Sequence, residues 1–183
     1  EDPGIYATWN LAIKESEGEF ISNANLDDRK SPYFAEKMAK MLYVNKDVDC
    51  VYSENYITNE PNETFEENSS NGQAYPASEF SKDAMLKANA PHCMPMWRKS
   101  LHDKFGYFKE DFKSASDWEF WLRCAFGGSS FKKVRERLGL YYFNPKGISS
   151  NPEGTWSKMQ EEKHVFMKYQ KIAQTGQELE LVL

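Results

Sequence analysis

The sequence contains few cysteines for its length. The three that are present, Cys50, Cys93 and Cys124, are widely spaced and form no CxxC pair. An odd number of scattered cysteines argues against a disulfide framework and against the common cysteine-based zinc sites. We therefore expect a protein of a reducing compartment.

Long apolar runs and an excess of basic residues are missing as well. No stretch approaches the roughly 20 apolar residues of a membrane helix, and no signal peptide is recognisable. The formal net charge is -5, with no long run of lysine and arginine. This balance predicts no nucleic-acid partner. We expect a cytoplasmic location, with the inner face of the membrane as a place of action.

What the sequence does contain is enough apolar residues for a core. Of its 183 residues, 40% are hydrophobic and 15% are aromatic. A chain of this size and composition fits one compact domain. We expect residues 1–183 to form that domain, with residues 155–183 as a surface helix and tail.

The order of the predicted elements indicates an α/β protein. A helix at residues 5–16 leads into a strand within residues 19–29, and a helix from Ser31 and Pro32 to about Tyr43 follows. Since that helix leads to a second buried strand at 48–56, the two strands should form a parallel pair. The remaining predictions are a lid-like loop at 58–77, a helix at 78–88, an irregular strand at 89–98, a helical turn at 99–105, a buried helix at 114–127 and tightly joined strands at 130–134 and 137–143.

The stretch that organises the chain is residues 19–29, because its strand ends in adjacent acids. Asp27, Asp28 and Arg29 follow directly and precede the next helix. Ligands of open α/β sheets bind at the carboxyl ends of strands. Paired carboxylates there suit Mg²⁺ or Mn²⁺, which take oxygen ligands. The alternative is a solvated acidic turn.

A second informative stretch is the buried helix near residue 117. Ser116 and Glu119 have the spacing of a capping box, which would leave the Asp117 carboxylate beyond the helix end. The helix dipole favours an ionised acid at that position. An aspartate in a first turn is also an ordinary structural feature, so the pattern alone leaves both interpretations open.

Together these two stretches resemble the inverting family 2 glycosyltransferases of the GT-A fold. The motifs that carry the resemblance are residues 25–29 (NLDDR), 116–123 (SDWEFWLR), 4–10 (GIYATWN), 18–21 (GEFI), 51–54 (VYSE), 99–101 (KSL) and 105–108 (FGYF). The similarity covers most of residues 4–151. It implies a GT-A-like mixed sheet flanked by helices.

The resemblance also implies functions for individual residues. Asp27 and Asp28 would bind Mn²⁺ or Mg²⁺ together with the diphosphate of a nucleotide sugar, most plausibly a UDP-sugar. Asp117 would be the general base, and Asn25 and Arg29 would contact the donor. His92 and Trp97 are candidates for the acceptor side, where a glycan or a lipid-linked acceptor would bind.

Three departures from the family pattern qualify this prediction. Asn25 stands where the motif usually has its first acid, and Ser116 stands where a glutamate commonly precedes the base. The family's first nucleotide-binding strands have no counterpart before Glu1, so we expect a fragment with an open sheet edge that favours self-association. The alternatives are a non-catalytic carbohydrate-binding remnant and a metal-dependent phosphoester hydrolase.

Overall fold

The computed structural model describes residues 2–148 and 150–176. The helices are α1 (Ile5–Glu15), α2 (Phe34–Val44), α3 (Lys82–Lys87), α4 (Ser100–Phe105), α5 (Ser116–Phe126) and α6 (Pro152–Thr175). The strands are β1 (Phe20–Ile21), β2 (Arg29–Lys30), β3 (Cys50–Thr58), β4 (Ala74–Tyr75), β5 (Met96–Arg98) and β6 (Phe131–Tyr142).

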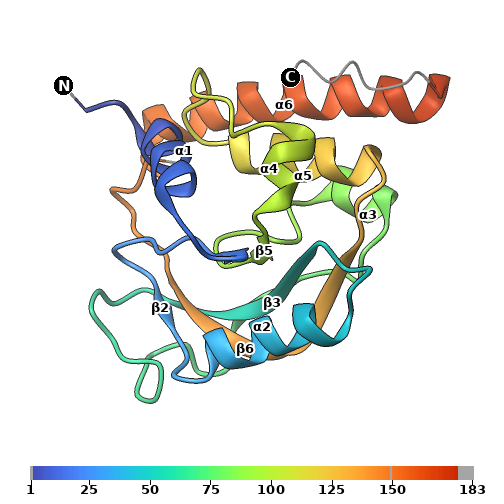
Figure 1. The fold of residues 1–183 in the computed structure, drawn as a ribbon. Helices are drawn as coiled ribbons and strands as arrows, with labels where there is room; N and C mark the ends of the chain where they lie inside the picture. Colours follow the sequence, from blue (N-terminus) through green and yellow to red (C-terminus); the bar gives the residue numbers. More distant parts are fainter. Residues whose placement is uncertain (1, 149, 177–183) are drawn as a thin grey trace.

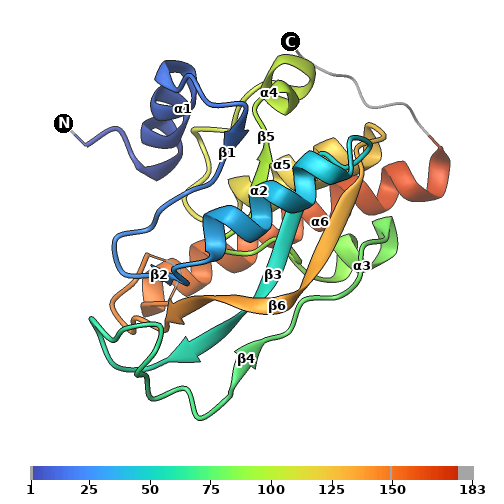
Figure 2. The ribbon, with the colours of Figure 1, turned by 60° about the horizontal axis from the view of Figure 1, so that its bottom comes forward.

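The strands form one mixed sheet with helices on both faces (Figures 1 and 2). The order is β1-β5-β3-β6-β2, and β4 pairs with β3 beyond the end of β5. The expected α/β architecture is therefore confirmed. The expected parallel pairing of the first two strands is wrong, because β5 lies between β1 and β3 and runs antiparallel to both. The parallel partner of β3 is β6.

Strand β6 is continuous, although two strands joined by a turn were predicted there. On the neighbouring strand β3, Ser53 pairs with Val134 of β6, and the next residue, Glu54, pairs with Arg137. The two intervening residues on β6 therefore have no partner on β3. A bulge absorbs extra residues without ending a strand, which explains why a sequence break was predicted where the strand only bends.

Glycine at position 139 leaves room for two side chains, where β6 passes under the chain that leads to β5. A Cβ atom on Gly139 would collide with Sδ of Met94 and with Oδ1 of Asn55. The lack of a side chain allows this close approach. As a result, the segment before β5 can lie directly against the middle of the sheet.

Among the described helices, α2 is the one that covers the first face of the sheet (Figure 2). Phe34, Met38 and Leu42 of α2 are buried, and their spacing places them on one side of the helix. They pack against Val51 of β3 and Leu138 of β6. A helix was predicted here, but α2 begins at Phe34 rather than Pro32, because Arg29 and Lys30 join the sheet as β2.

The other face is covered by α1, α3, α4, α5 and α6, which share a larger core with β3, β5 and β6 (Figure 1). Helix α5 lies at its centre, and its buried residues are Ser116, Trp118, Glu119, Phe120, Trp121, Leu122, Cys124 and Ala125. The prediction of a deeply buried helix at this position is therefore confirmed.

Helix α6 lies on the surface, as predicted, and most of its described residues are exposed or half-buried. It begins at Pro152, and Val165 and Tyr169 on its inner side are fully buried. The Tyr169 ring contacts Phe126 of α5, with centroids 5.4 Å apart. The tail predicted at 177–183 lies outside the described residues.

Candidate active site

The acidic motif lies in the connection between β1 and β2 and is held by a chain of amide contacts. Nδ2 of Asn23 donates to the carbonyl oxygen of Cys93 at 2.5 Å. Nδ2 of Asn25 donates to Oδ2 of Asp28 at 2.8 Å. The backbone N–H of Tyr142, at the end of β6, donates to Oδ1 of Asp28 at 3.1 Å. The motif is therefore fastened both to β6 and to the chain before β5.

The two adjacent carboxylates have different surroundings. Asp28 is only 8% exposed, and both of its oxygens accept hydrogen bonds from neutral donors. Burial raises the pKa of Asp28 to about 6, against the opposing effect of these hydrogen bonds. Asp27 is exposed, and within the described ranges its carboxylate accepts no hydrogen bond and forms no ion pair. Asp27 thus has free oxygens, whereas Asp28 braces the turn.

Arg29 braces the same turn from the other side. Its Nη1 donates to the backbone carbonyls of Leu26 and Asp28, at 3.2 and 2.9 Å. Its Nη2 donates to Oδ1 of Asn62 at 3.3 Å, which connects the motif to the loop at residues 59–73. The guanidinium is half-buried, with part of it still accessible to a ligand.

Asp117 lies in the first turn of α5 and is held by two side chains from distant segments. Nδ2 of Asn89 donates to Oδ2 of Asp117 at 2.8 Å, and the hydroxyl of Tyr6 donates to Oδ1 at 3.3 Å. Burial raises the pKa of Asp117, and the hydrogen bonds oppose this only in part. Burial and the charge of Asp117 keep Tyr6 protonated by raising its pKa far above the ordinary value.

The predicted capping box at the start of α5 is wrong. The Ser116 hydroxyl is buried without a hydrogen-bond partner in the described part of the chain, and Glu119 faces α6. The cap is Glu161 of α6, whose carboxylate accepts from the backbone N–H groups of Lys113, Ser114 and Ala115 at 2.8–3.0 Å. A negative charge at a helix N-terminus is favourable. Through these three contacts Glu161 fixes the end of α5 that carries Asp117.

The chain between Asn89 and Cys93 connects Asp117 to the acidic motif. Asn89 contacts Asp117, and Cys93 accepts the hydrogen bond from Asn23. The charges of Asp28, Asp117 and Asp27 all add to the effect of burial in raising the pKa of the Cys93 thiol. The two motifs, about ninety residues apart in sequence, are therefore brought to the same place.

His92 lies in this connecting chain, in a left-handed conformation with φ 45°. Its ring stacks on Tyr75 of β4 at 3.8 Å between centroids and meets the edge of Tyr141 at 5.0 Å. Burial lowers the pKa of His92 to about 4, so the ring is neutral at physiological pH. Its Nδ1 is buried and makes no hydrogen bond to any described residue.

Trp97 does not lie at the candidate site, contrary to the prediction. The side chain is 1% exposed, packs against Trp121 and donates from Nε1 to Nε2 of His102 at 2.9 Å. An indole that is already buried and hydrogen-bonded is not available to stack on a sugar. The extended segment that contains Trp97 is an inner strand of the sheet, which the two nearby prolines concealed.

Tyr6, Asn89 and Glu161 were not predicted to be part of this site. None of them stands in a local pattern that distinguishes it from other surface or helix residues. Only the folded chain places them beside Asp117. The position of Tyr6 within the family-like segment 4–10 was the one available signal.

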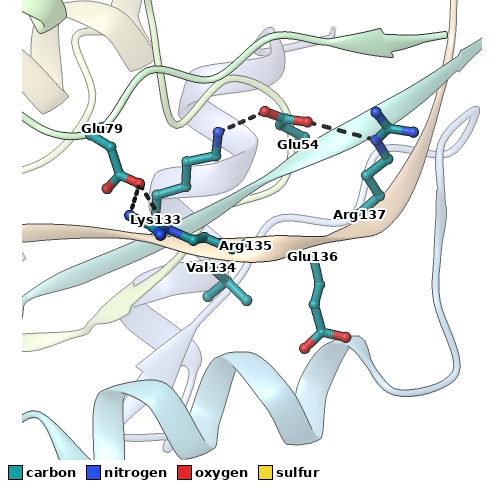
Figure 3. A pocket seen from close by; sticks show the side chains of 7 residues that line it. All are labelled: Glu54, Glu79, Lys133, Val134, Arg135, Glu136 and Arg137. Carbon is teal, nitrogen blue, oxygen red and sulfur yellow. Dashed lines mark hydrogen bonds and ion pairs between the residues drawn. The ribbon is translucent and has the colours of Figure 1, made fainter.

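A separate pocket of about 300 Å³ lies at the β6 bulge and contains none of the predicted site residues (Figure 3). Lys133 and Arg137 both approach Glu54, at 2.6 and 3.6 Å, and Arg135 approaches Glu79 at 3.0 Å. The hydrogen bond from Lys133 is the main cause that lowers the pKa of Glu54. These charges satisfy one another, which is typical of a structural cluster.

The carboxylates of the candidate site differ from a preformed metal centre. No group of three or more histidine, cysteine or acidic side chains in residues 2–148 and 150–176 is placed to hold a metal ion. The free oxygens of Asp27 still suit a hard cation that shares its other ligands with phosphates and water. Among the described helices, none has the length and apolar character needed to cross a membrane.

No family model matches the sequence. Two curated relatives are named as glycosyltransferases. The uncharacterized glycosyltransferase YwdF of Bacillus subtilis (strain 168) is 33% identical over 160 residues, which covers 84% of this chain and 56% of the relative. The uncharacterized glycosyltransferase MJ1057 of Methanocaldococcus jannaschii is 26% identical over 138 residues, covering 75% and 47%. The chain thus spans about half the length of these relatives.

Solved structures of similar fold were found as well. S. aureus TarS 1-349 in complex with UDP has a TM-score of 0.63 at 18% identity, covering 91% of this chain and 45% of that chain. The complex of TarS 1-349 with UDP-GlcNAc has a TM-score of 0.62 at 15% identity, covering 91% and 52%. The resemblance to glycosyltransferases is therefore confirmed at this level: the chain is related in sequence to proteins named as glycosyltransferases and has the fold of TarS.

Proposed function

We propose that this chain takes part in the transfer of a sugar from a nucleotide-diphosphate donor to an acceptor hydroxyl, with inversion at the anomeric carbon. The observation that carries the proposal is the position of Asp117, held by Asn89 and Tyr6 beside the chain that leads to the acidic motif. Sugar transfer is supported by the named relatives. The complexes of TarS with UDP and UDP-GlcNAc support a UDP-sugar as the donor.

In this proposal Asp117 is the general base. The acceptor hydroxyl gives its proton to a carboxylate oxygen of Asp117 while the acceptor oxygen bonds to the anomeric carbon. The bond from that carbon to the diphosphate oxygen breaks on the opposite face. The raised pKa of Asp117 strengthens it as a base. Oδ1 is the better placed oxygen, since the contact from Tyr6 at 3.3 Å is longer than the contact of Asn89 to Oδ2.

The acidic motif is proposed as the diphosphate site. Asp27 would ligate Mn²⁺ or Mg²⁺ with its free oxygens. Asp28 would hold the turn and add its negative charge beside that of Asp27. A bound divalent cation neutralises charge on a departing diphosphate. Asn25 and the accessible part of Arg29 would contact the donor.

The neutral ring of His92 is proposed for the acceptor side, close to Asn89. The acceptor itself is proposed to be a glycan or a lipid-linked sugar, in the synthesis of a surface polysaccharide or glycoconjugate. Self-association through the edge of β1 stays a prediction.

The experiment that tests the base is Asp117→Asn in a sugar-transferring protein that contains this chain. We expect kcat to fall by about 10²- to 10⁴-fold with KM little changed. Asp83→Asn is the matched control, because Asp83 is also an aspartate in a first helical turn but is exposed. Wild-type turnover in the Asp117 variant would remove Asp117 from the mechanism.

The experiment that tests the cation site is calorimetric titration of the same protein with UDP-GlcNAc, with and without Mn²⁺. Nucleotide affinity should rise with Mn²⁺ in the wild type and in Asp47→Asn, whose exposed acid lies elsewhere, but not in Asp27→Asn. Equal affinity with and without the metal in the wild type would contradict the proposed role of Asp27.

A further inference from the structure

A groove of about 590 Å³ lies beside the acidic motif, between the start of α2, the end of β3 and the loop at residues 59–73. Three aromatic side chains line it, Tyr33, Tyr56 and Phe65, with Pro32 next to them. Its size is within the range of sites for small ligands, which are commonly lined by aromatic side chains and a few polar groups.

The rings in the groove present open apolar surface. Tyr33 is 61% exposed, and the rings of Tyr56 and Phe65 are tilted by 59° with centroids 6.0 Å apart. The Arg137 guanidinium packs on the Tyr56 ring at 5.1 Å and holds it in place. Such rings offer flat faces on which the C–H surface of a sugar can stack.

Unused polar groups surround these rings. Within the described residues, the carboxylate of Glu66 and the hydroxyls of Tyr33 and Tyr56 make no hydrogen bond or ion pair. Across the same described residues, Oδ1 of Asn71 also accepts no hydrogen bond. Nδ2 of the same side chain donates to the backbone carbonyl oxygen of Ser69. A negative carboxylate among hydroxyl groups disfavours phosphates and favours a ligand with many hydroxyl groups.

The loop that carries Phe65 is held in its shape by its own contacts. The carboxylate of Glu63 accepts from the backbone N–H of Ser69 at 2.8 Å and from its hydroxyl at 2.9 Å. Nδ2 of Asn68 donates to the carbonyl oxygen of Phe65 at 2.9 Å. A site that is formed before binding loses less conformational freedom when a ligand enters.

The groove is linked to the acidic motif by one hydrogen bond and by the chain itself. Arg29 holds the turn of the acidic motif and also donates to Asn62 in the loop. The groove begins at Ser31, two residues after Arg29. The groove therefore lies next to the acidic motif, which is proposed to hold the donor diphosphate.

We propose that this groove binds a neutral glycan chain of two or more hexopyranose units, as the extended part of the acceptor. The proposal rests on the proposed function for its role in transfer, but binding of the glycan does not depend on catalysis. It assigns to the groove the recognition of acceptor length rather than of the transferred sugar.

The test is calorimetric titration of the 183-residue chain with cellohexaose, maltohexaose and chitohexaose, each compared with its monosaccharide. At least one hexasaccharide should bind, and more tightly than its monosaccharide. Tyr33→Ala should weaken that binding by about tenfold, a common effect of removing an aromatic anchor. Tyr43→Ala is the control, because Tyr43 is 65% exposed in the last turn of α2 and lies outside the groove.

Failure of this proposal is distinguishable from failure of the proposed function. Asp117→Asn should bind the hexasaccharide like the wild type, whatever its effect on transfer. Absence of binding by all three hexasaccharides, or equal weakening by Tyr33→Ala and Tyr43→Ala, would overturn the glycan site. So would a dimer in light scattering that only Tyr33→Ala dissociates, because the groove would then be a contact between copies of this chain.

Discussion

Two pairs of acids in this molecule are stabilised in different ways. Asp28 and Asp117 receive hydrogen bonds only from amides, a hydroxyl and a backbone N–H, and burial raises their pKa values. Glu119 is at least as buried, yet its pKa is lowered, because Arg123 and Lys168 together outweigh the effect of burial. Glu54 is likewise paired with Lys133.

The difference separates acids that can exchange a proton from acids that hold the fold. A carboxylate with neutral partners can gain or lose a proton without leaving a cation unpaired. A carboxylate that neutralises a buried arginine cannot, because the remaining charge would be costly. Four substitutions test this distinction, from the largest expected effect to the smallest.

Glu119→Gln should cause the largest loss of stability. It removes the anion that faces Arg123 at 2.7 Å and accepts from the Tyr169 hydroxyl at 3.0 Å. Breaking a buried pair in this way costs about 3–5 kcal/mol of unfolding free energy. Urea denaturation should show this loss, while Asp117→Asn should stay within about 1 kcal/mol of the wild type because its partners are neutral. Equal losses in the two variants would remove the distinction.

Asp28→Asn should change how stability depends on pH. Because the pKa of Asp28 is about 6 in the folded chain and 3.8 as the reference value, the folded state binds more protons between these pH values. Wild-type stability therefore falls as pH rises through this window. Between pH 4 and pH 8, the free energy of unfolding of the variant should therefore rise by about 2 kcal/mol relative to that of the wild type.

Thermal unfolding at both pH values measures this gain, with Asp27→Asn as the control. Asp27 is the exposed neighbour, so its replacement should leave the pH dependence close to that of the wild type. A gain of the same size in both variants would show that burial of Asp28 is not the cause.

Glu161→Ala should have an intermediate effect, because it removes a carboxylate that accepts hydrogen bonds from three backbone N–H groups and from the Ser114 hydroxyl. Loss of a helix cap costs about 1 kcal/mol. Hydrogen exchange of the amides at residues 113–115 should accelerate, since these groups lose their acceptor. Gln160→Ala changes the exposed neighbour on the same helix and should leave these amides protected.

Glu79→Gln should have the smallest effect, although it also breaks an ion pair. Glu79 and Arg135 are 61% and 83% exposed in their side chains, so water replaces the lost contact. Exposed pairs contribute at most about 1 kcal/mol and often much less. A loss in urea denaturation as large as that of Glu119→Gln would mean that exposure does not decide the strength of these pairs.

The parts of the fold that could be predicted from the sequence are those fixed by local patterns. The stripe of Phe34, Met38 and Leu42 on α2 follows from helical spacing, and the apolar character of α5 on nearly every side requires burial. The adjacent acids were also found from a local pattern, but the predicted strand that would end in them is wrong: β1 ends at Ile21, and Asp27 and Asp28 lie in the connection to β2.

The rest depends on contacts between distant segments. Position 97 reads as an edge residue because of nearby prolines, but β5 is inserted between β1 and β3. Tyr6 and Asn89 reach Asp117 across 111 and 28 positions. The capping pattern of Ser116 and Glu119 was misleading because the Glu119 carboxylate binds Arg123, its i+4 neighbour, and Tyr169 of α6. Helical spacing could indicate the contact with Arg123, but the contact with Tyr169 spans 50 positions.

The cap on α5 has a consequence for the order in which this molecule becomes complete during synthesis. Glu161 is 46 positions beyond Ala115, whose N–H it accepts. At ribosomal rates of about 5–20 residues per second, roughly 2–9 s pass between the two residues leaving the peptidyl-transfer centre. By the end of that interval the chain contains Asp117, the acidic motif and all the described strands, of which β6 is made within the interval. A nascent chain therefore contains Asp117 and the acidic motif before it contains Glu161, the residue that holds the start of α5 in place.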